Sequence, residues 1–413
     1  MSALRQFLEQ SRAVQVLLLN ELTIFLSFYM LFPYLAVYFR EHLGFSVWMV
    51  GLILGIRTLS QQGLTVIGGT LADRLGYKPL IIAGLGLRAA GFALFGFVDS
   101  LAGTLAAAVL TGLAGAMFGP ALRAYLAAEA PARRTEVFAL ANLAAQVGTL
   151  LGPPVGVALL VFSFRVTCVV AGAIFLGLML LQFRYLPRRI DHVPEGPQPV
   201  LREWGEVLGN RGFLLFAGTM LAYSVLVSQM YLALPLEVRR VTGSDAGIGA
   251  LFVMSSILTL AGQIHVTEWC RRRYRPPEAI ALGLALMGLA FLAPLAAALG
   301  PSTGTHGGAG AALTRLGPTM IAMALLSVGM MVVSPFSMAM VPRFARDRLI
   351  ATYYGFYSMA GGLGTMTGNA LLGAALDAQS HPALAALPWA IMVAIGAGAA
   401  LAMRGLDRRR LLA

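Results

Sequence analysis

The stretch GGTLADRLGYKP, residues 68–79, interrupts two long apolar runs and decides how the chain is organised. Its carboxylate, cations, glycines and proline predict a short charged turn in water. Proline is favoured in the first turn of a helix, so we expect a new helix from Pro79. If the flanking runs cross a membrane, Arg74 and Lys78 stay among the inner headgroups. Asp73 then faces the positive end of a neighbouring helix.

The composition is that of an integral membrane protein. Of the 413 residues, 58% are hydrophobic and 12% are charged, against about 25% charged in an ordinary soluble domain. The net charge of +12 does not indicate nucleic-acid binding, because the basic residues lie between apolar runs and not on one soluble face. Cys168 and Cys270 lie far apart, at what the helix pattern below assigns to opposite membrane faces, so we expect neither a disulfide nor a metal site from them. The first apolar run is too long for a cleaved signal peptide.

Apolar runs of about 20 residues recur along the chain, and each is long enough to cross a hydrocarbon core of about 30 Å. We therefore predict an all-α membrane protein with twelve transmembrane helices. The expected spans are 15–39, 46–70, 79–98, 102–127, 136–161, 165–185, 211–236, 245–268, 278–299, 318–341, 349–376 and 386–404. They form two six-helix bundles, 1–185 and 211–413, joined by a cytoplasmic linker over 186–210 with an amphipathic piece around Trp204.

The positions of Lys and Arg predict the orientation of these helices. Most loop cations fall on the side of the N-terminus, the even-to-odd connections and the C-terminus, so both termini are expected in the cytoplasm. The opposite side holds only Arg40, Arg165, Arg239, Arg240 and Arg315. We expect a monomeric, multi-pass protein of a bacterial cytoplasmic (inner) membrane.

The two halves of the sequence contain similar features in the same order. Gly119-Pro120 in the first half and Ser334-Pro335 in the second each precede an arginine-bearing turn and a glycine-lined helix. Parallel six-helix repeats of this kind are a transporter architecture, with the substrate site at the interface of the halves.

At full length the chain resembles transporters of the major facilitator superfamily. Residues 69–78 fit the G-x-x-x-D-R-x-G-x-K motif that this superfamily carries between helices 2 and 3, through Gly69, Asp73, Arg74, Gly76 and Lys78. The resemblance implies a conformational latch, in which Asp73 meets the N-terminus of helix 11 near residues 349–351. Arg74, Lys78, Glu129, Arg133 and Arg134 would complete that inner-face network.

A second likeness is to the 12-helix drug:proton antiporter family. Residues 148–156, GTLLGPPVG, resemble its G-x-x-x-G-P-x-x-G motif through Gly148, Gly152, Pro153 and Gly156. Glycines let helix backbones approach closely and prolines bend helices, which favours a moving helix interface and export over uptake. Finer likenesses to the MdtH-type multidrug exporters are Asn20-Glu21, Phe32-Pro33, GIR at 55–57, QQ at 61–62 and RAAGF at 88–92.

Ionisable groups at membrane depth are costly and indicate a functional site by default. Glu21 is the one acidic residue clearly inside a predicted helix, and Arg57, Arg88 and Arg123 are the cations inside helices. The resemblance puts helices 1 and 4 side by side, so Glu21 can pair with Arg123. Two roles stay open for Glu21: a carboxylate that couples transport to protons, or a permanently ionised partner of an arginine. The same alternatives apply to the three arginines.

Aromatic, methionine and amide side chains supply an adaptable site for amphiphilic compounds. The resemblance places helices 1, 5, 7, 10 and 11 around the central cavity. The substrate-binding candidates on them are Phe28, Phe32, Tyr34, Asn142, Gln146, Tyr223, Gln229, Tyr231, Met330, Met331, Tyr353, Tyr354 and Tyr357. For each of them, packing or lipid contact is the alternative role. The excess of arginine in the N-terminal half favours substrates with an acidic group, such as zwitterions.

The leading hypothesis is a secondary active transporter that exports small amphiphilic compounds in exchange for protons, a multidrug antiporter conferring antibiotic resistance. Its expected partners are these compounds, protons and the lipid bilayer. It is expected to need no cofactor, because the proton gradient drives it and the sequence has no G-x-x-x-x-G-K-[ST] phosphate loop for ATP. The alternative is a selective transporter of a metabolite, siderophore or nutrient.

A membrane-embedded enzyme is a remote alternative. The five histidines are scattered, and the sequence has neither H-E-x-x-H nor G-x-S-x-G. His265 and Glu268 have the spacing of two metal ligands on one helix, but two ligands alone rarely make a site. We therefore expect neither a metal site nor catalysis.

Overall fold

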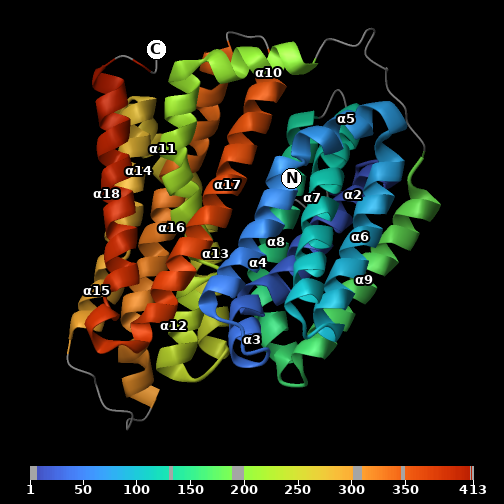
Figure 1. The fold of residues 1–413 in the computed structure, drawn as a ribbon. Helices are drawn as coiled ribbons and strands as arrows, with labels where there is room; N and C mark the ends of the chain where they lie inside the picture. The colour runs from blue at the N-terminus through green and yellow to red at the C-terminus, as the bar shows by residue number, and fades with distance from the viewer. Residues whose placement is uncertain are drawn as a thin grey trace. The chain divides into compact units, whose positions relative to one another are not determined.

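The computed structural model describes residues 7–129, 134–187, 200–300, 309–345, 349–409 and 411 (Figure 1). Throughout these ranges, the regular secondary structure consists of α-helices and short 3-10 turns. The all-α prediction is confirmed. The amphipathic piece predicted around Trp204 is also a helix, α10 (Val200–Gly209).

All six predicted spans of the first half form helices. They are α2 (Arg12–Leu31), η1 (Phe32–Tyr34), α3 (Leu35–Glu41), α4 (Val47–Gly63), α5 (Thr65–Leu75), α6 (Tyr77–Phe97), α7 (Leu101–Glu129), α8 (Arg134–Leu160) and α9 (Phe164–Tyr185). The first span is divided at Pro33, whose missing amide hydrogen removes one helical hydrogen bond. A 3-10 turn therefore separates α2 from α3.

The second half is helical in the same way. Its elements are α11 (Arg211–Ser228), α12 (Ala233–Thr242), α13 (Ala246–Arg273), α14 (Pro276–Leu289), α15 (Leu292–Leu299), α16 (Ala309–Ala345), α17 (Ile350–Asp377), η3 (Ala378–Ser380), η4 (Pro382–Leu384) and α18 (Leu387–Arg408). Asn210 begins α11, where its side-chain oxygen accepts the amide hydrogen of Phe213 at 3.0 Å. Such a cap satisfies one of the amides that a helix start leaves without a partner.

The prediction of a charged turn over residues 68–79 was wrong in its extent. Residues up to Leu75 continue α5, because alanine, arginine and leucine favour a helix and charge alone does not end one. The turn is made at Gly76, whose φ of 86° is rare for residues with a side chain. The next helix begins at Tyr77, so Pro79 lies in its first turn, as predicted.

Ten helical segments within the described residues are long and apolar enough to cross a membrane. They correspond to ten of the twelve predicted spans, and they indicate a multi-pass membrane protein. The other two spans, 46–70 and 349–376, also form helices, α4 with α5 and α17. Both are rich in glycine and polar residues, which lowers their mean hydropathy. Their passage through the membrane stays a prediction.

The chain divides into two compact units. The first comprises Met1–Phe32 with Ile56–Gln198, and the second comprises Pro33–Gly55 with Pro199–Ala413. The division after Gln198 falls inside the predicted linker. The segment Pro33–Gly55, however, packs with the later part of the chain although it belongs to the first half in sequence. Helix α4 therefore contributes residues to both units.

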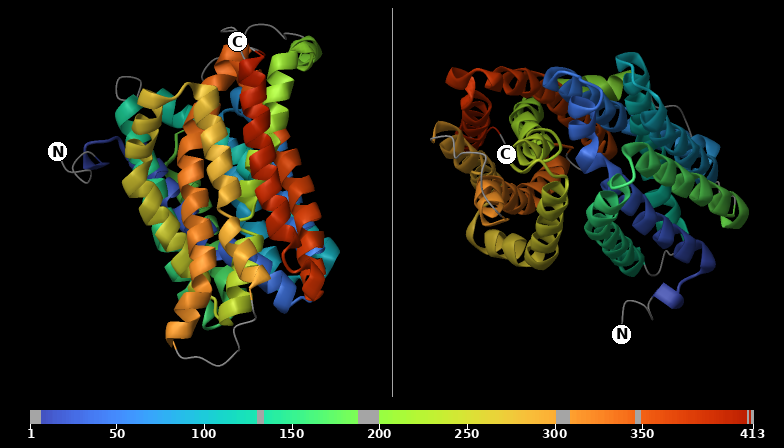
Figure 2. Two further views of the ribbon diagram at one scale, coloured as in Figure 1. Left: turned by 90° about the vertical axis from the view of Figure 1, so that its left-hand side faces the viewer. Right: turned by 90° about the horizontal axis from the view of Figure 1, so that it is seen from below.

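Within the first unit, α2 packs against α8, and α6 packs against both α7 and α9. Within the second, α14 packs against α16 and α18, and α11 packs against α17. Figures 1 and 2 show α14, α16 and α18 as near-parallel neighbours. Glycine allows the closest contacts: a Cβ atom on Gly396 of α18 would lie 2.4 Å from the Cα atom of Gly288 on α14.

Candidate functional site

Glu21 lies inside α2, and its side chain is partly buried. Its charge interacts with the charges of Arg123 and Arg88. Among the residues that the structure describes, however, it has no ion-pair partner within 4 Å. Arg123 on α7 is exposed, whereas Arg88 on α6 is 7% exposed. The structure thus places Glu21 in the field of both arginines without the close Glu21–Arg123 pair that we predicted.

Arg88 is buried among aromatic rings. Its guanidinium carbon lies 5.6 Å from the centre of the Phe175 ring on α9, and this ring stacks on Phe92 at 5.2 Å. A cation over an aromatic face gains about 2 kcal/mol or more when both are desolvated. Because burying a charge costs several kcal/mol, the ring contact offsets only part of that cost. The charge of Glu21 offsets a further part.

Arg57 on α4 is held by the aromatic rings of Phe28 on α2 and Phe32, the first residue of η1. Its guanidinium carbon lies 4.8 Å from the centre of the Phe28 ring and 4.5 Å from that of Phe32. The two rings stack on each other at 4.5 Å, since residues four apart share one face of a helix. Phe28 and Phe32, predicted to bind substrate, thus form the wall on which this buried cation rests.

Gln61 connects Arg57 to the surroundings of Arg88. It lies one turn after Arg57 on α4 and accepts a hydrogen bond from Arg57 Nη2 at 2.9 Å. A Cβ atom on Gly115 of α7 would lie 2.8 Å from Gln61 Cδ and 3.0 Å from Arg88 Nη2. We call Glu21, Arg57, Gln61, Arg88 and Arg123 the charge cluster. Gln61 was singled out only as a family likeness, although its spacing of four from Arg57 indicated this pairing.

The antiporter motif of α8 lies directly on the backbone of α2. A Cβ atom on Gly148 would lie 2.3 Å from the carbonyl oxygen of Leu22, and one on Gly152 would lie 2.6 Å from Tyr29 Cβ. Side chains larger than hydrogen do not fit at such distances. Pro153 lies within α8, and Gly156 is buried. The motif therefore binds α8 tightly to the helix that carries Glu21.

The predicted inner-face network is described only in part. The side chains of Asp73, Arg74 and Arg134, and the whole of Arg133, lie outside the described residues. The contact of Asp73 with helix 11 thus stays a prediction.

The described members of that network connect helices within the first unit. Lys78 donates a hydrogen bond to the carbonyl oxygen of Phe183 at 2.9 Å, which ties the start of α6 to α9. Ser11 donates to Glu129 Oε1 at 3.2 Å, which ties the start of α2 to the end of α7. Gly69 approaches Pro120 of α7, and a Cβ atom on it would lie 3.8 Å from Pro120 Cβ.

Three candidate tyrosines of α17 contact protein groups. Tyr353 accepts a hydrogen bond from Asn210 at 3.1 Å, and Tyr354 donates one to the carbonyl oxygen of Met338 at 2.7 Å. Tyr357 lies beside Ser337 of α16 and stacks with Phe216 of α11 at 6.0 Å. These contacts join α11, α16 and α17.

Gln229 joins α11 to α17 through a buried polar cluster. Its Nε2 atom donates to Ser228 Oγ and to Asn369 Oδ1, each at 3.0 Å, and Ser228 Oγ donates to Asn369 Oδ1 at 2.6 Å. Gln229 was predicted as a substrate contact, whereas Ser228 and Asn369 were not selected. Nothing in the local sequence indicates this pairing, because the partners lie 140 residues apart.

The remaining candidates differ in burial. Tyr34 and Met331 are 2% and 1% exposed, and Tyr231 packs on Phe252 with ring centres 5.5 Å apart. Tyr223 lies beside Ser334 and Tyr357. Asn142 is exposed, and Gln146 and Met330 are partly exposed. Across the described residues, no three His, Cys, Asp or Glu side chains are grouped to hold a metal ion.

The family model of the Major Facilitator Superfamily matches residues 17–369. The chain belongs to this superfamily. An uncharacterized MFS-type transporter of Mycobacterium tuberculosis is 38% identical over 399 residues, which cover 96% of this chain and 94% of the relative. The multidrug resistance protein MdtH of Klebsiella pneumoniae is 30% identical over 383 residues, with 92% and 90% covered. The resemblance read from the motifs is confirmed.

Solved structures show the same fold at low sequence identity. The crystal structure of the peptide transporter POT in complex with sulfate superposes with a TM-score of 0.80 at 15% identity, covering 100% of this chain and 99% of that one. The nucleoside transporter NupG gives a TM-score of 0.79 at 14% identity, covering 96% and 100%. Because the matched superfamily and the Mycobacterium tuberculosis relative are transporters, the comparisons point to a transporter and away from an enzyme.

Proposed function

We propose that this member of the major facilitator superfamily exports small amphiphilic compounds in exchange for protons by alternating access. The observation that carries the proposal is the charge cluster, in which one carboxylate, Glu21, lies in the field of Arg88 and Arg123 without a close ion pair. The likeness to the multidrug resistance protein MdtH supports the substrate class.

Protonation of Glu21 changes the balance of this cluster. An ionised Glu21 attracts both arginines, and a protonated one leaves their positive charges uncompensated. Two unit charges 4 Å apart at an effective dielectric of 20 interact by about 4 kcal/mol, and more distant charges by less. One charge that crosses 100 mV of membrane potential gains about 2.3 kcal/mol. Because these energies are of similar size, one proton on Glu21 is enough to bias a conformational equilibrium.

The packing of α2 carries this change to the rest of the first unit. Gly148 and Gly152 hold α8 against the backbone of α2, and Phe28 of α2 with Phe32 of η1 holds Arg57 of α4. A shift of α2 on protonation therefore moves elements that carry the substrate-binding candidates. Aromatic walls beside a fixed cation suit amphiphilic compounds that bear an acidic group.

The cellular setting of the proposal is a bacterial cytoplasmic membrane, with both termini in the cytoplasm and a monomeric carrier. The proton gradient supplies the energy, so transport needs no bound cofactor. Arg271 and Arg272 pair with Glu268 at 2.8 Å near the end of α13 that the distribution of cations assigns to the cytoplasm.

The test is drug accumulation in cells that express wild type, Glu21→Gln, Glu21→Asp or Glu206→Gln, with and without a protonophore. Glu206 is an exposed glutamate on α10 and serves as the control. Wild type and the control should lower the accumulation of several unrelated amphiphiles, and the protonophore and Glu21→Gln should abolish this. Glu21→Asp should retain part of the activity.

Two results would change the proposal. Protonophore-sensitive export by Glu21→Gln would move the coupling site away from Glu21. No gradient-dependent change in accumulation for any amphiphile would favour a selective transporter.

A further inference from the structure

Asp377 ends α17 and caps the start of α4. Its Oδ1 atom accepts the amide hydrogen of Val47 at 2.9 Å, and its Oδ2 atom accepts that of Trp48 at 2.9 Å. These are the first two amides of α4, which have no partner inside their own helix. The negative carboxylate also interacts favourably with the positive end of the helix. Arg40 of α3 lies 3.4 Å from the same carboxylate.

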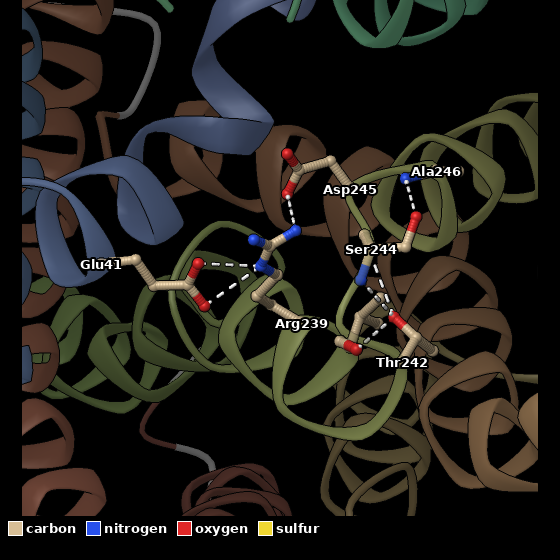
Figure 3. Close-up of polar contacts among 7 residues, drawn as sticks. Glu41, Arg239, Thr242, Ser244, Asp245 and Ala246 are labelled. Carbon is tan, nitrogen blue, oxygen red and sulfur yellow. Dashed lines mark hydrogen bonds and ion pairs between the residues drawn. The ribbon is translucent and has the colours of Figure 1, made fainter. Parts of the chain in front are cut away.

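A second polar contact lies at the same end of these helices. Arg239, in the last turn of α12, donates from Nε to both carboxylate oxygens of Glu41, at 2.8 and 3.1 Å (Figure 3). Its Nη1 atom lies 3.4 Å from Asp245, the residue before α13 (Figure 3). Glu41 ends α3, so one arginine joins three helices.

Further along α4 from the Asp377 contact, the backbones of α4 and α17 touch each other. A Cβ atom on Gly51 would lie 2.2 Å from the carbonyl oxygen of Asn369, and one on Gly55 would lie 2.6 Å from Met366 Cα. From the other side, a Cβ atom on Gly373 would lie 2.6 Å from the carbonyl oxygen of Val47. Positions 47, 51 and 55 are one turn apart and share a face. Two of these three positions are glycine, which allows the backbones of α4 and α17 to touch.

The contact joins residues 33–55, which belong to the first half in sequence, to helices of the second half. Residues 33–55 follow α2 directly and lead into the first unit at Ile56, yet they contact α12 and α17 of the second unit. By the proposed orientation, Glu41, Val47 and Asp377 lie at the outer face. A carboxylate on the N-terminus of a helix from the other half is also the chemistry that the family motif implies for Asp73 at the inner face.

We infer that Asp377, together with the Glu41–Arg239–Asp245 contact, is an outer latch that holds the outward end of the transport path closed in this structure. Opening to the outside requires the Asp377 carboxylate to leave the amides of Val47 and Trp48. The Asp377 contact is the stronger part, because both of its oxygens bind amides that otherwise lack a partner. Arg239 and Glu41 are about one quarter and two fifths exposed and contribute less. The inference rests on the proposed function.

The test measures the outer distance directly in the purified full-length protein. Cys168 and Cys270, both buried, are replaced by serine, and spin labels are attached at His42→Cys and His381→Cys, two exposed sites on either side of the latch. Pulsed electron spin resonance then gives the distance distribution between the labels. The variants are Asp377→Ala, Gly51→Val and, as the control, Asp99→Asn, an exposed aspartate between α6 and α7.

The background protein should give mainly the short distance. Asp377→Ala should raise the population at longer distance about tenfold, the change expected when hydrogen bonds to a charged group are lost. Gly51→Val should do the same by a different route, because its side chain would overlap the backbone of α17. Asp99→Asn should leave the distribution unchanged.

An unchanged distribution in both Asp377→Ala and Gly51→Val would overturn the latch. An equal change in Asp99→Asn would overturn it too, because the effect would then not be specific to Asp377. The measurement needs no substrate and no proton gradient. If the distance measurement contradicts the latch while the accumulation assay shows drug export, the proposed function still stands. If the accumulation assay shows no export by wild type, the distance result is unaffected.

Discussion

At the scale of the residue, the cations of the first unit are placed by aromatic rings. Arg57 rests on Phe28 and Phe32, and Arg88 lies over Phe175. Aromatic rings offset part of the cost of burying a cation without a second charge, and Glu21 supplies the negative charge of the cluster. In the proposed function, Glu21 is the carboxylate that takes up and releases a proton among these cations.

The shape of the Arg57 side chain matters as much as its charge. A guanidinium is planar and stacks on rings, whereas an ammonium is compact and strongly hydrated. We expect Arg57→Lys to lower the free energy of unfolding by about 1–2 kcal/mol through loss of the contacts with Phe28 and Phe32. Thermal unfolding of the purified protein measures this. Arg211→Lys at the exposed start of α11 is the control and should change little; equal losses in the two variants would contradict the role of the rings.

At the scale of the element, glycine positions determine which helices touch. Gly148 lies against the carbonyl oxygen of Leu22, so Gly148→Ala should force α8 away from α2. We expect a loss of about 1–3 kcal/mol in stability, as is usual for overpacking, together with a fall in drug export. Gly177→Ala on α9 is the matched control, because nothing lies within 4 Å of the added methyl group. Its stability should be equal or slightly higher, since alanine favours a helix.

Differential scanning fluorimetry and the accumulation assay together measure both effects. If Gly148→Ala and Gly177→Ala were equally stable and equally active, close packing of α8 on α2 would not be a requirement. A loss of export at unchanged stability would instead place the role of Gly148 in helix motion.

The helices themselves were predictable from sequence, because apolar length and composition define them. Ten of the twelve expected spans meet the length and hydropathy expected of membrane helices, and the motif at 69–78 identified the superfamily. The end of α5 was missed, because Asp73 and Arg74 were interpreted as a turn although neither residue breaks a helix.

Contacts between distant residues were not predictable in this way. The capping of α4 by Asp377 joins residues 330 positions apart, and Gln229 meets Asn369 across 140. No periodicity in a single sequence encodes such pairs. Gln61 differs, because it lies four residues from Arg57 and a search for helical pairs would have found it.

At the scale of the whole molecule, the predicted orientation depends on how many Lys and Arg residues lie in the loops on each side. Three of the five cations assigned to the outside are paired in the structure: Arg40 with Asp377, Arg239 with Glu41 and Arg240 with Glu237. Arg165 donates to the carbonyl oxygen of Gly96. Arg271 and Arg272 on the predicted inner side are paired as well, so pairing does not distinguish the two faces, and the orientation stays a prediction from the number of Lys and Arg.

Reporter fusions test this orientation. Green fluorescent protein fused after Leu186, in the linker, or after Ala413 should fluoresce, because it folds in the cytoplasm, and alkaline phosphatase at these sites should be inactive. Fusions after Gly300, which follows α15, should give the opposite pair of results. Fluorescence after Gly300 would contradict the proposed topology. It would also move the Asp377 contact to the inner face, where it would hold the cytoplasmic end of the path closed instead of the outer one.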